Sequence, residues 1–101
     1  MDISAAEFNS RYKNQDSFFI IDVREELEYQ TFNIGGDSIP LGNLLNNVEG
    51  INYPKDAEIV IICQRGLRSE TARLALSKNG YTNVRNLDGG ILALRKIRTF
   101  L

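Results

Sequence analysis

Two short segments of the chain are apolar almost throughout, and they limit the possible folds more than any other feature of the sequence. They are Phe18–Val23 and Glu58–Ile62. Apolar runs of this length, rich in Ile and Val, are typical of parallel strands that are buried on both faces of a sheet. Because parallel neighbours need crossover connections, which are usually helices, these runs predict a sheet with helices packed against it.

Helical segments are predicted between and beside these strands. Ser4 followed by Glu7 forms a capping box, which predicts a helix over Ser4–Asn14. Further helical turns are expected over four ranges: Arg24–Tyr29, Leu41–Val48, Ser69–Asn79 and Ile91–Leu101. Two shorter strands are expected at Ser38–Pro40 and Asn83–Leu87. Strands joined by helices predict one α/β domain over residues 1–101, with a small, mostly parallel sheet flanked by helices on both faces.

The composition excludes several classes of function. With one Cys and no His, the chain holds no Cys-His dyad, no Ser-His-Asp triad, no imidazole zinc site and no internal disulfide. A formal net charge of −1 gives no reason to expect nucleic acid as a partner. No apolar run is long enough to cross a bilayer, and the start of the chain shows no secretory signal. We therefore expect a cytoplasmic protein with no metal, no cofactor and no membrane partner.

The lone Cys lies directly after the second apolar run. Cys63 ends this predicted strand, and a predicted helix begins near Ser69. Ligands of open parallel sheets bind at the carboxyl ends of the strands. The N–H groups of a short loop and the positive end of a helix favour ionisation of a thiol, and the thiolate is the nucleophilic form. These features predict a catalytic thiol; a small buried Cys at a strand end is the alternative.

The segment after the Cys is predicted to bind the substrate. It consists of Gln64, Arg65, Gly66, Leu67, Arg68 and Ser69. We expect Gly66 to turn the loop tightly at positive φ. Arg65 and Arg68 add positive charge that suits an anionic substrate.

Three motifs, in order along the chain, resemble those of the single-domain rhodaneses. Cys63–Arg68 resembles the active-site pattern Cys-x-x-Gly-x-Arg, and Leu87-Asp88-Gly89-Gly90 resembles the Leu-x-Gly-Gly turn. Asp22-Val23-Arg24, with Glu28-Tyr29, resembles the first motif of the family. The resemblance covers nearly the whole chain and implies the rhodanese fold and a sulfurtransferase. In that family a Cys thiolate takes the outer sulfur of a donor, which is thiosulfate or a persulfide. It then passes this sulfur to a thiol or a sulfur-carrier protein.

The chain departs from the family pattern at two places. Phe32–Leu41 is shortened and lacks the His that many members carry there, and Leu94 stands in place of the usual Trp. The shortened segment is similar to that of rhodanese domains fused to the adenylyltransferases that activate sulfur carriers. The resemblance therefore implies an adenylyltransferase, fused or separate, as a partner.

Two charged residues are expected to support the site, and other functions stay open. A carboxylate at the end of a buried strand needs a partner, so we expect Asp22 and Arg24 to brace the loop or to pair with each other. Glu28 is expected to be a solvated or structural carboxylate rather than a catalytic one. A phosphatase of related fold needs Cys-x5-Arg, and Arg68 lies one residue short of that spacing. A non-catalytic docking or regulatory domain and a redox-sensing thiol remain as alternatives.

Overall fold

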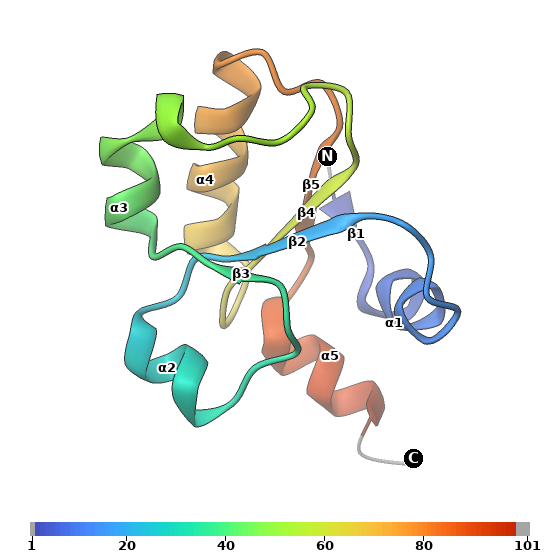
Figure 1. Ribbon diagram of the computed structural model, residues 1–101. Helices are drawn as coiled ribbons and strands as arrows, with labels where there is room; N and C mark the ends of the chain where they lie inside the picture. Colours follow the sequence, from blue (N-terminus) through green and yellow to red (C-terminus); the bar gives the residue numbers. More distant parts are fainter. Residues whose placement is uncertain (1, 99–101) are drawn as a thin grey trace.

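A parallel sheet forms the centre of the protein (Figure 1). The computed structural model describes residues 2–98. In this range the strands are β1 (Asp2–Ile3), β2 (Phe19–Asp22), β3 (Asp37–Ser38), β4 (Ile59–Ile62) and β5 (Val84–Leu87). They lie in the order β1-β5-β4-β2-β3, and every neighbouring pair is parallel. This arrangement confirms the predicted parallel sheet, and it places β4 at the centre, with a strand on each side.

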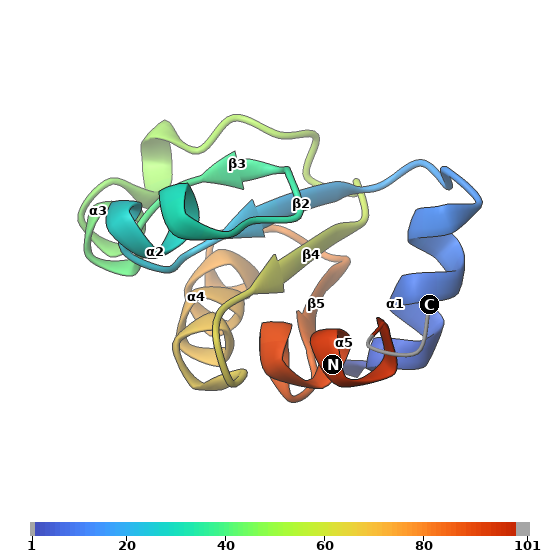
Figure 2. The same cartoon turned by 90° about the horizontal axis from the view of Figure 1, so that it is seen from below.

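Helices cover both faces of this sheet (Figures 1 and 2). They are α1 (Ala5–Lys13), α2 (Glu26–Thr31), α3 (Leu41–Asn46), α4 (Leu67–Lys78) and α5 (Gly90–Arg98), with a short 3-10 turn at Val48–Gly50. The pair α3 and α4 packs on one face and the pair α1 and α5 on the other. Within residues 2–98, no helix is long and apolar enough to span a membrane.

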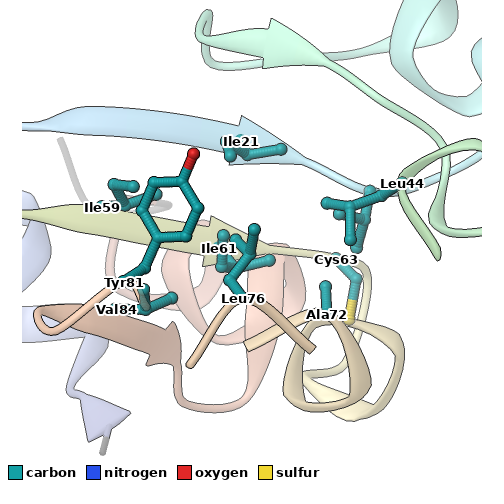
Figure 3. Close-up of a cluster of buried hydrophobic side chains, with 10 residues drawn as sticks. Ile21, Leu44, Ile59, Ile61, Cys63, Ala72, Leu76, Tyr81 and Val84 are labelled. Carbon is teal, nitrogen blue, oxygen red and sulfur yellow. The ribbon is translucent and has the colours of Figure 1, made fainter. Parts of the chain in front are cut away.

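The central strand β4 divides the core into two clusters. Ile59 and Ile61 point to the face covered by α3 and α4, whereas Val60 and Ile62 point to the face covered by α1 and α5. Cys63 follows the same alternation and points to the same face as Ile59 and Ile61. Its side chain therefore lies at one end of the first cluster, beside Ala72 of α4 (Figure 3).

Two helix starts show how local sequence sets the boundaries. The Ser4 hydroxyl accepts the N–H of Glu7 at 3.0 Å, which confirms the predicted cap of α1. By contrast, α4 begins at Leu67, two residues before the predicted start at Ser69. It begins early because Gly66, at φ +94°, turns the chain directly into the first helical turn.

Other expectations are corrected or lie outside the described range. Burial on both faces of Phe18–Val23 was wrong for its first half, because Phe19 is 43% exposed and its ring packs against Tyr53. The sequence pattern missed β1, since two residues are too few to show a period. The last residues of the predicted helix Ile91–Leu101, residues 99–101, lie outside the part that the structure describes.

Candidate active site

The sulfur of Cys63 is surrounded by hydrogen-bond donors in the loop between β4 and α4. The backbone N–H groups of Gly66 and Ser69 donate to Sγ at 3.0 and 3.3 Å. The Ser69 hydroxyl lies 3.2 Å from the same sulfur. The positive φ of Gly66 makes this convergence possible, because it turns the first N–H groups of α4 back toward Cys63. Only 1% of Cys63 is exposed.

These surroundings act on the thiol pKa in opposite directions. Burial raises the pKa of Cys63, because a buried site disfavours the charged thiolate. The hydrogen bonds from Ser69 and from the N–H groups of Gly66 and Arg65 lower it. The lowering effects prevail, and the pKa of Cys63 lies below its ordinary value. The fraction of nucleophilic thiolate at neutral pH is correspondingly larger.

The first turn of α5 supports the active-site loop from behind. The N–H groups of Ile91 and Leu92 donate to the carbonyls of Cys63 and Gln64, at 2.9 and 3.1 Å. This close approach requires a glycine at position 90: its φ is +65°, and a Cβ there would lie 2.5 Å from the Gln64 carbonyl. The second Gly of the Leu-x-Gly-Gly motif thus allows α5 to pack against the active-site loop.

Asn86 of β5 holds the loop from the side, and no sequence motif pointed to it. Its Nδ2 donates to the Gly66 carbonyl at 3.0 Å, so its Oδ1 faces the Ser69 hydroxyl and accepts a hydrogen bond from it. Asn86 is buried and pairs in register with Ile61 of β4. Strand pairing therefore brings it close to the sulfur, 23 positions after Cys63 in the chain. The Ser69 hydroxyl has two neighbours, Asn86 Oδ1 and Cys63 Sγ.

Arg68 forms a two-pronged ion pair with Glu28 of α2. Arg68 Nη1 lies 2.7 Å from Glu28 Oε1, and Nη2 lies 3.0 Å from Oε2. The hydrogen bonds from Arg68 lower the pKa of Glu28 to about 2, and the same contact raises the pKa of Arg68. Glu28 Oε1 also accepts the N–H of Glu25, which caps α2. The sequence suggested a positive charge available to an anion, but the structure places a carboxylate against it.

A pocket of about 250 Å³ opens above this loop. Its walls come from Cys63, Gln64, Arg65, Leu67 and Arg68. Gly66 and Ser69, the remaining members of the predicted loop, contact the sulfur itself. A neighbouring pocket of about 390 Å³ shares Gln64 and is lined otherwise by residues of α2, α5 and the β2–α2 connection. The structure thus brings the whole predicted loop together around one thiol.

Asp22 and Arg24 pair with each other. Arg24 Nη2 lies 2.9 Å from Asp22 Oδ2, and the Arg24 backbone N–H donates to Asp22 Oδ1 at 3.0 Å. The same guanidinium donates to the Phe32 carbonyl at 2.6 Å. Of the two expected arrangements, the structure shows mutual pairing. The buried pair ties the end of β2 to the end of α2, the helix from which Glu28 reaches Arg68.

Comparison with known proteins identifies the family of this fold and loop. The sequence profile described as "Rhodanese-like domain" matches residues 4–96. The chain belongs to the rhodanese-like domain family. The resemblance predicted from the three motifs is therefore confirmed.

Relatives of this rhodanese-like domain include sulfurtransferases. "Sulfurtransferase" of Allochromatium vinosum is 32% identical over 92 residues, which cover 91% of this chain and 85% of that protein. "Probable adenylyltransferase/sulfurtransferase MoeZ" of Mycobacterium tuberculosis is 36% identical over 78 residues, covering 76% of this chain and 20% of MoeZ. "tRNA uridine(34) hydroxylase" of Bdellovibrio bacteriovorus is 34% identical over 98 residues, covering 93% of this chain and 28% of the hydroxylase. The rhodanese-like domain thus spans less than a third of the last two relatives.

A solved structure supports the same assignment. The crystal structure of a rhodanese-related protein from Thermoplasma volcanium superposes with a TM-score of 0.79 at 29% identity, covering 95% of this chain and 91% of that one. This likeness confirms the predicted rhodanese-like α/β fold, with a parallel sheet between helices.

Proposed function

We propose that this rhodanese-like domain is a sulfurtransferase that carries sulfur on Cys63 as a persulfide. One observation carries the proposal: the buried Sγ lies within hydrogen-bond distance of two backbone N–H groups and the Ser69 hydroxyl, beside an open pocket. These donors stabilise a thiolate before the reaction and the negative charge of a persulfide after it. The sulfurtransferases among the relatives support the same reaction class.

In the first half-reaction the thiolate attacks the outer sulfur of thiosulfate or of a persulfide donor. A bond forms between Cys63 Sγ and that sulfur, and the bond between the sulfur and the rest of the donor breaks. The electron pair leaves with sulfite, or with the thiolate of the persulfide donor. Because the thiol ionises before attack, the step needs no general base, which fits a chain without His.

In the second half-reaction a nucleophilic acceptor attacks the terminal sulfur, and the Cys63 thiolate leaves with the electron pair of the broken bond. The chain has no second Cys that could release the sulfur by forming an internal disulfide. The acceptor therefore lies outside this domain and is a thiol or a sulfur-carrier protein. The two steps together consume no oxidant, metal or cofactor.

The other residues act by position and charge. Gly66 and Ser69 supply the N–H donors, and the remaining loop residues, Gln64, Arg65, Leu67 and Arg68, form the entrance for the donor. Asp22 and Arg24 are positioning residues that hold α2. The relative MoeZ supports an adenylyltransferase, fused or separate, as a partner. A free thiol that must stay reduced suits a reducing compartment such as the cytoplasm.

The test is intact-mass spectrometry of the freshly reduced domain after incubation with thiosulfate or a small persulfide. We expect the mass of one added sulfur atom in the wild type and none in Cys63→Ser. A wild-type domain that stays unmodified with both donors would overturn the proposal. In that event, normal partner binding by Cys63→Ala would favour a docking domain, and rapid reaction with peroxide would favour a redox-sensing thiol.

A further inference from the structure

We propose that Glu28 sets the donor preference of the Cys63 pocket. By binding the Arg68 guanidinium, it disfavours a doubly charged donor such as thiosulfate. It leaves the pocket suited to an organic sulfur donor that carries at most one negative charge. This inference rests on the proposed sulfurtransferase function and adds the substrate class.

The ion pair occupies the part of Arg68 that would bind an anion. An Arg recognises a planar or tetrahedral anion through two parallel N–H groups, and both Nη atoms of Arg68 already face Glu28, at 2.7 and 3.0 Å. Each side chain is 35% exposed, so the pair stands at the surface of the site rather than in the core. A doubly charged donor must either displace the Glu28 carboxylate or bind beside it.

In the absence of a donor, the positive and negative formal charges of the side chains around the thiol are equal in number. Arg65 of the loop is exposed and lines the pocket with Arg68. Against these two cations stand the Cys63 thiolate and the Glu28 carboxylate. The surrounding elements carry three further charged groups. Arg24 is paired with Asp22, and Glu25 lies at the start of α2. Arg95 of α5 stacks on the Phe32 ring at 4.5 Å, beside the neighbouring pocket. The pocket over the sulfur therefore has no surplus of positive charge for a dianion.

Apolar side chains beside the site suit an organic donor. Leu67, which lines the Cys63 pocket, is 77% exposed, and Leu27, which lines the neighbouring pocket, is 74% exposed. Gln64 belongs to both pockets and connects them. The carbon body of an organic persulfide or thiosulfonate can cover these leucines while its outer sulfur reaches Cys63, whereas thiosulfate has no carbon to place there.

The experiment compares two donors that differ by one charge, thiosulfate and benzenethiosulfonate, with wild type and Glu28→Gln. The substitution keeps the shape of the side chain and the Oε1 that accepts the Glu25 N–H. The repulsion between the Glu28 carboxylate and a donor is proportional to the charge of the donor. If removal of the Glu28 charge raises kcat/KM for the dianion thiosulfate by about tenfold, it should therefore raise kcat/KM for the monoanion benzenethiosulfonate by about threefold. We therefore expect the ratio of thiosulfate to benzenethiosulfonate kcat/KM to rise about threefold.

Glu26→Gln is the matched control, since it removes the same charge from the same helix at a residue bound by Gln30. We expect its donor ratio to equal that of the wild type. A folded Glu28→Gln domain with an unchanged or lower donor ratio would overturn the proposal. A ratio that rises equally in Glu26→Gln would also overturn it, because the effect would then come from net charge.

A second measurement does not depend on sulfur transfer. Iodoacetate is an anion and iodoacetamide is neutral, and the ratio of their alkylation rates at Cys63 cancels the thiolate fraction. We expect Glu28→Gln to raise the ratio of the iodoacetate rate to the iodoacetamide rate, and Glu26→Gln to leave it unchanged. If the wild type forms no persulfide, the proposed function fails while the alkylation ratio still decides the role of Glu28. An unchanged alkylation ratio in Glu28→Gln would overturn the inference even if persulfide forms.

Discussion

Replacing Ser69 by Ala tests how the loop activates its thiol. The Ser69 hydroxyl donates to Asn86 Oδ1 in the structure and lies 3.2 Å from Cys63 Sγ. When the thiol ionises, the single hydroxyl proton can turn to the sulfur. A hydrogen bond to a charged group contributes about 1.5–3 kcal/mol, and giving up the bond to Asn86 costs about 0.5–1.5 kcal/mol. The midpoints of these ranges differ by about 1.3 kcal/mol, which corresponds to a change of about tenfold in the ionisation constant of the thiol.

We therefore expect Ser69→Ala to raise the pKa of Cys63 and to slow its reaction at neutral pH by up to about tenfold. The assay is the rate of alkylation by iodoacetamide as a function of pH. Ser77→Ala makes the same substitution at an exposed position of the same helix and should leave the pKa unchanged. A pKa that is unchanged or lowered in a folded Ser69→Ala domain would refute the reasoning, because it would mean that the hydroxyl stays on Asn86.

Three further predictions concern stability. Gly90→Ala should lower the unfolding free energy by about 2 kcal/mol more than Gly35→Ala does, as measured by denaturant titration. Both glycines have positive φ, but only a Cβ at position 90 would meet the Gln64 backbone. Equal losses in the two variants would contradict this reasoning. The pKa of Glu28 is lowered to about 2, so its contribution to stability is lost as pH falls from about 4.5 toward 2, and the stability of Glu28→Gln should fall less than that of the wild type over this range. The lowered pKa of Cys63 also makes stability depend on pH: the unfolding free energy should increase as pH rises from the folded-state pKa to about 8.5, the pKa of an unfolded Cys. Cys63→Ser should lack this increase. Parallel pH profiles of unfolding free energy for the wild type and Cys63→Ser would contradict the prediction.

The sequence predicts those parts of the fold and site that depend on neighbours along the chain. The apolar run of β4, the glycine that turns the loop and the Cys that precedes it are adjacent in sequence, and the structure places them as expected. The N-cap of α1 is equally local, since Ser4 and Glu7 lie within one helical turn.

The parts that the sequence does not predict depend on pairing between distant segments. Asn86 reaches the Ser69 hydroxyl only because β4 and β5 pair in one register, which no local pattern encodes. Glu28 meets Arg68 because α2 lies beside the start of α4, with 40 positions between the two residues. The surroundings of Phe19 likewise depend on a distant segment, since its half-exposed ring packs against Tyr53. These long-range contacts decide the charge and proton arrangement of the site.

The most direct test of the central claim follows one sulfur atom. The reduced domain is incubated with a donor whose outer sulfur is isotopically labelled, freed of excess donor and then mixed with a small thiol. The account predicts that the label appears on the Cys63 peptide as one added sulfur, leaves when the thiol is added, and is absent throughout from Cys63→Ser. A label that never appears on Cys63, or that stays there in the presence of excess thiol, would contradict sulfur transfer through this residue.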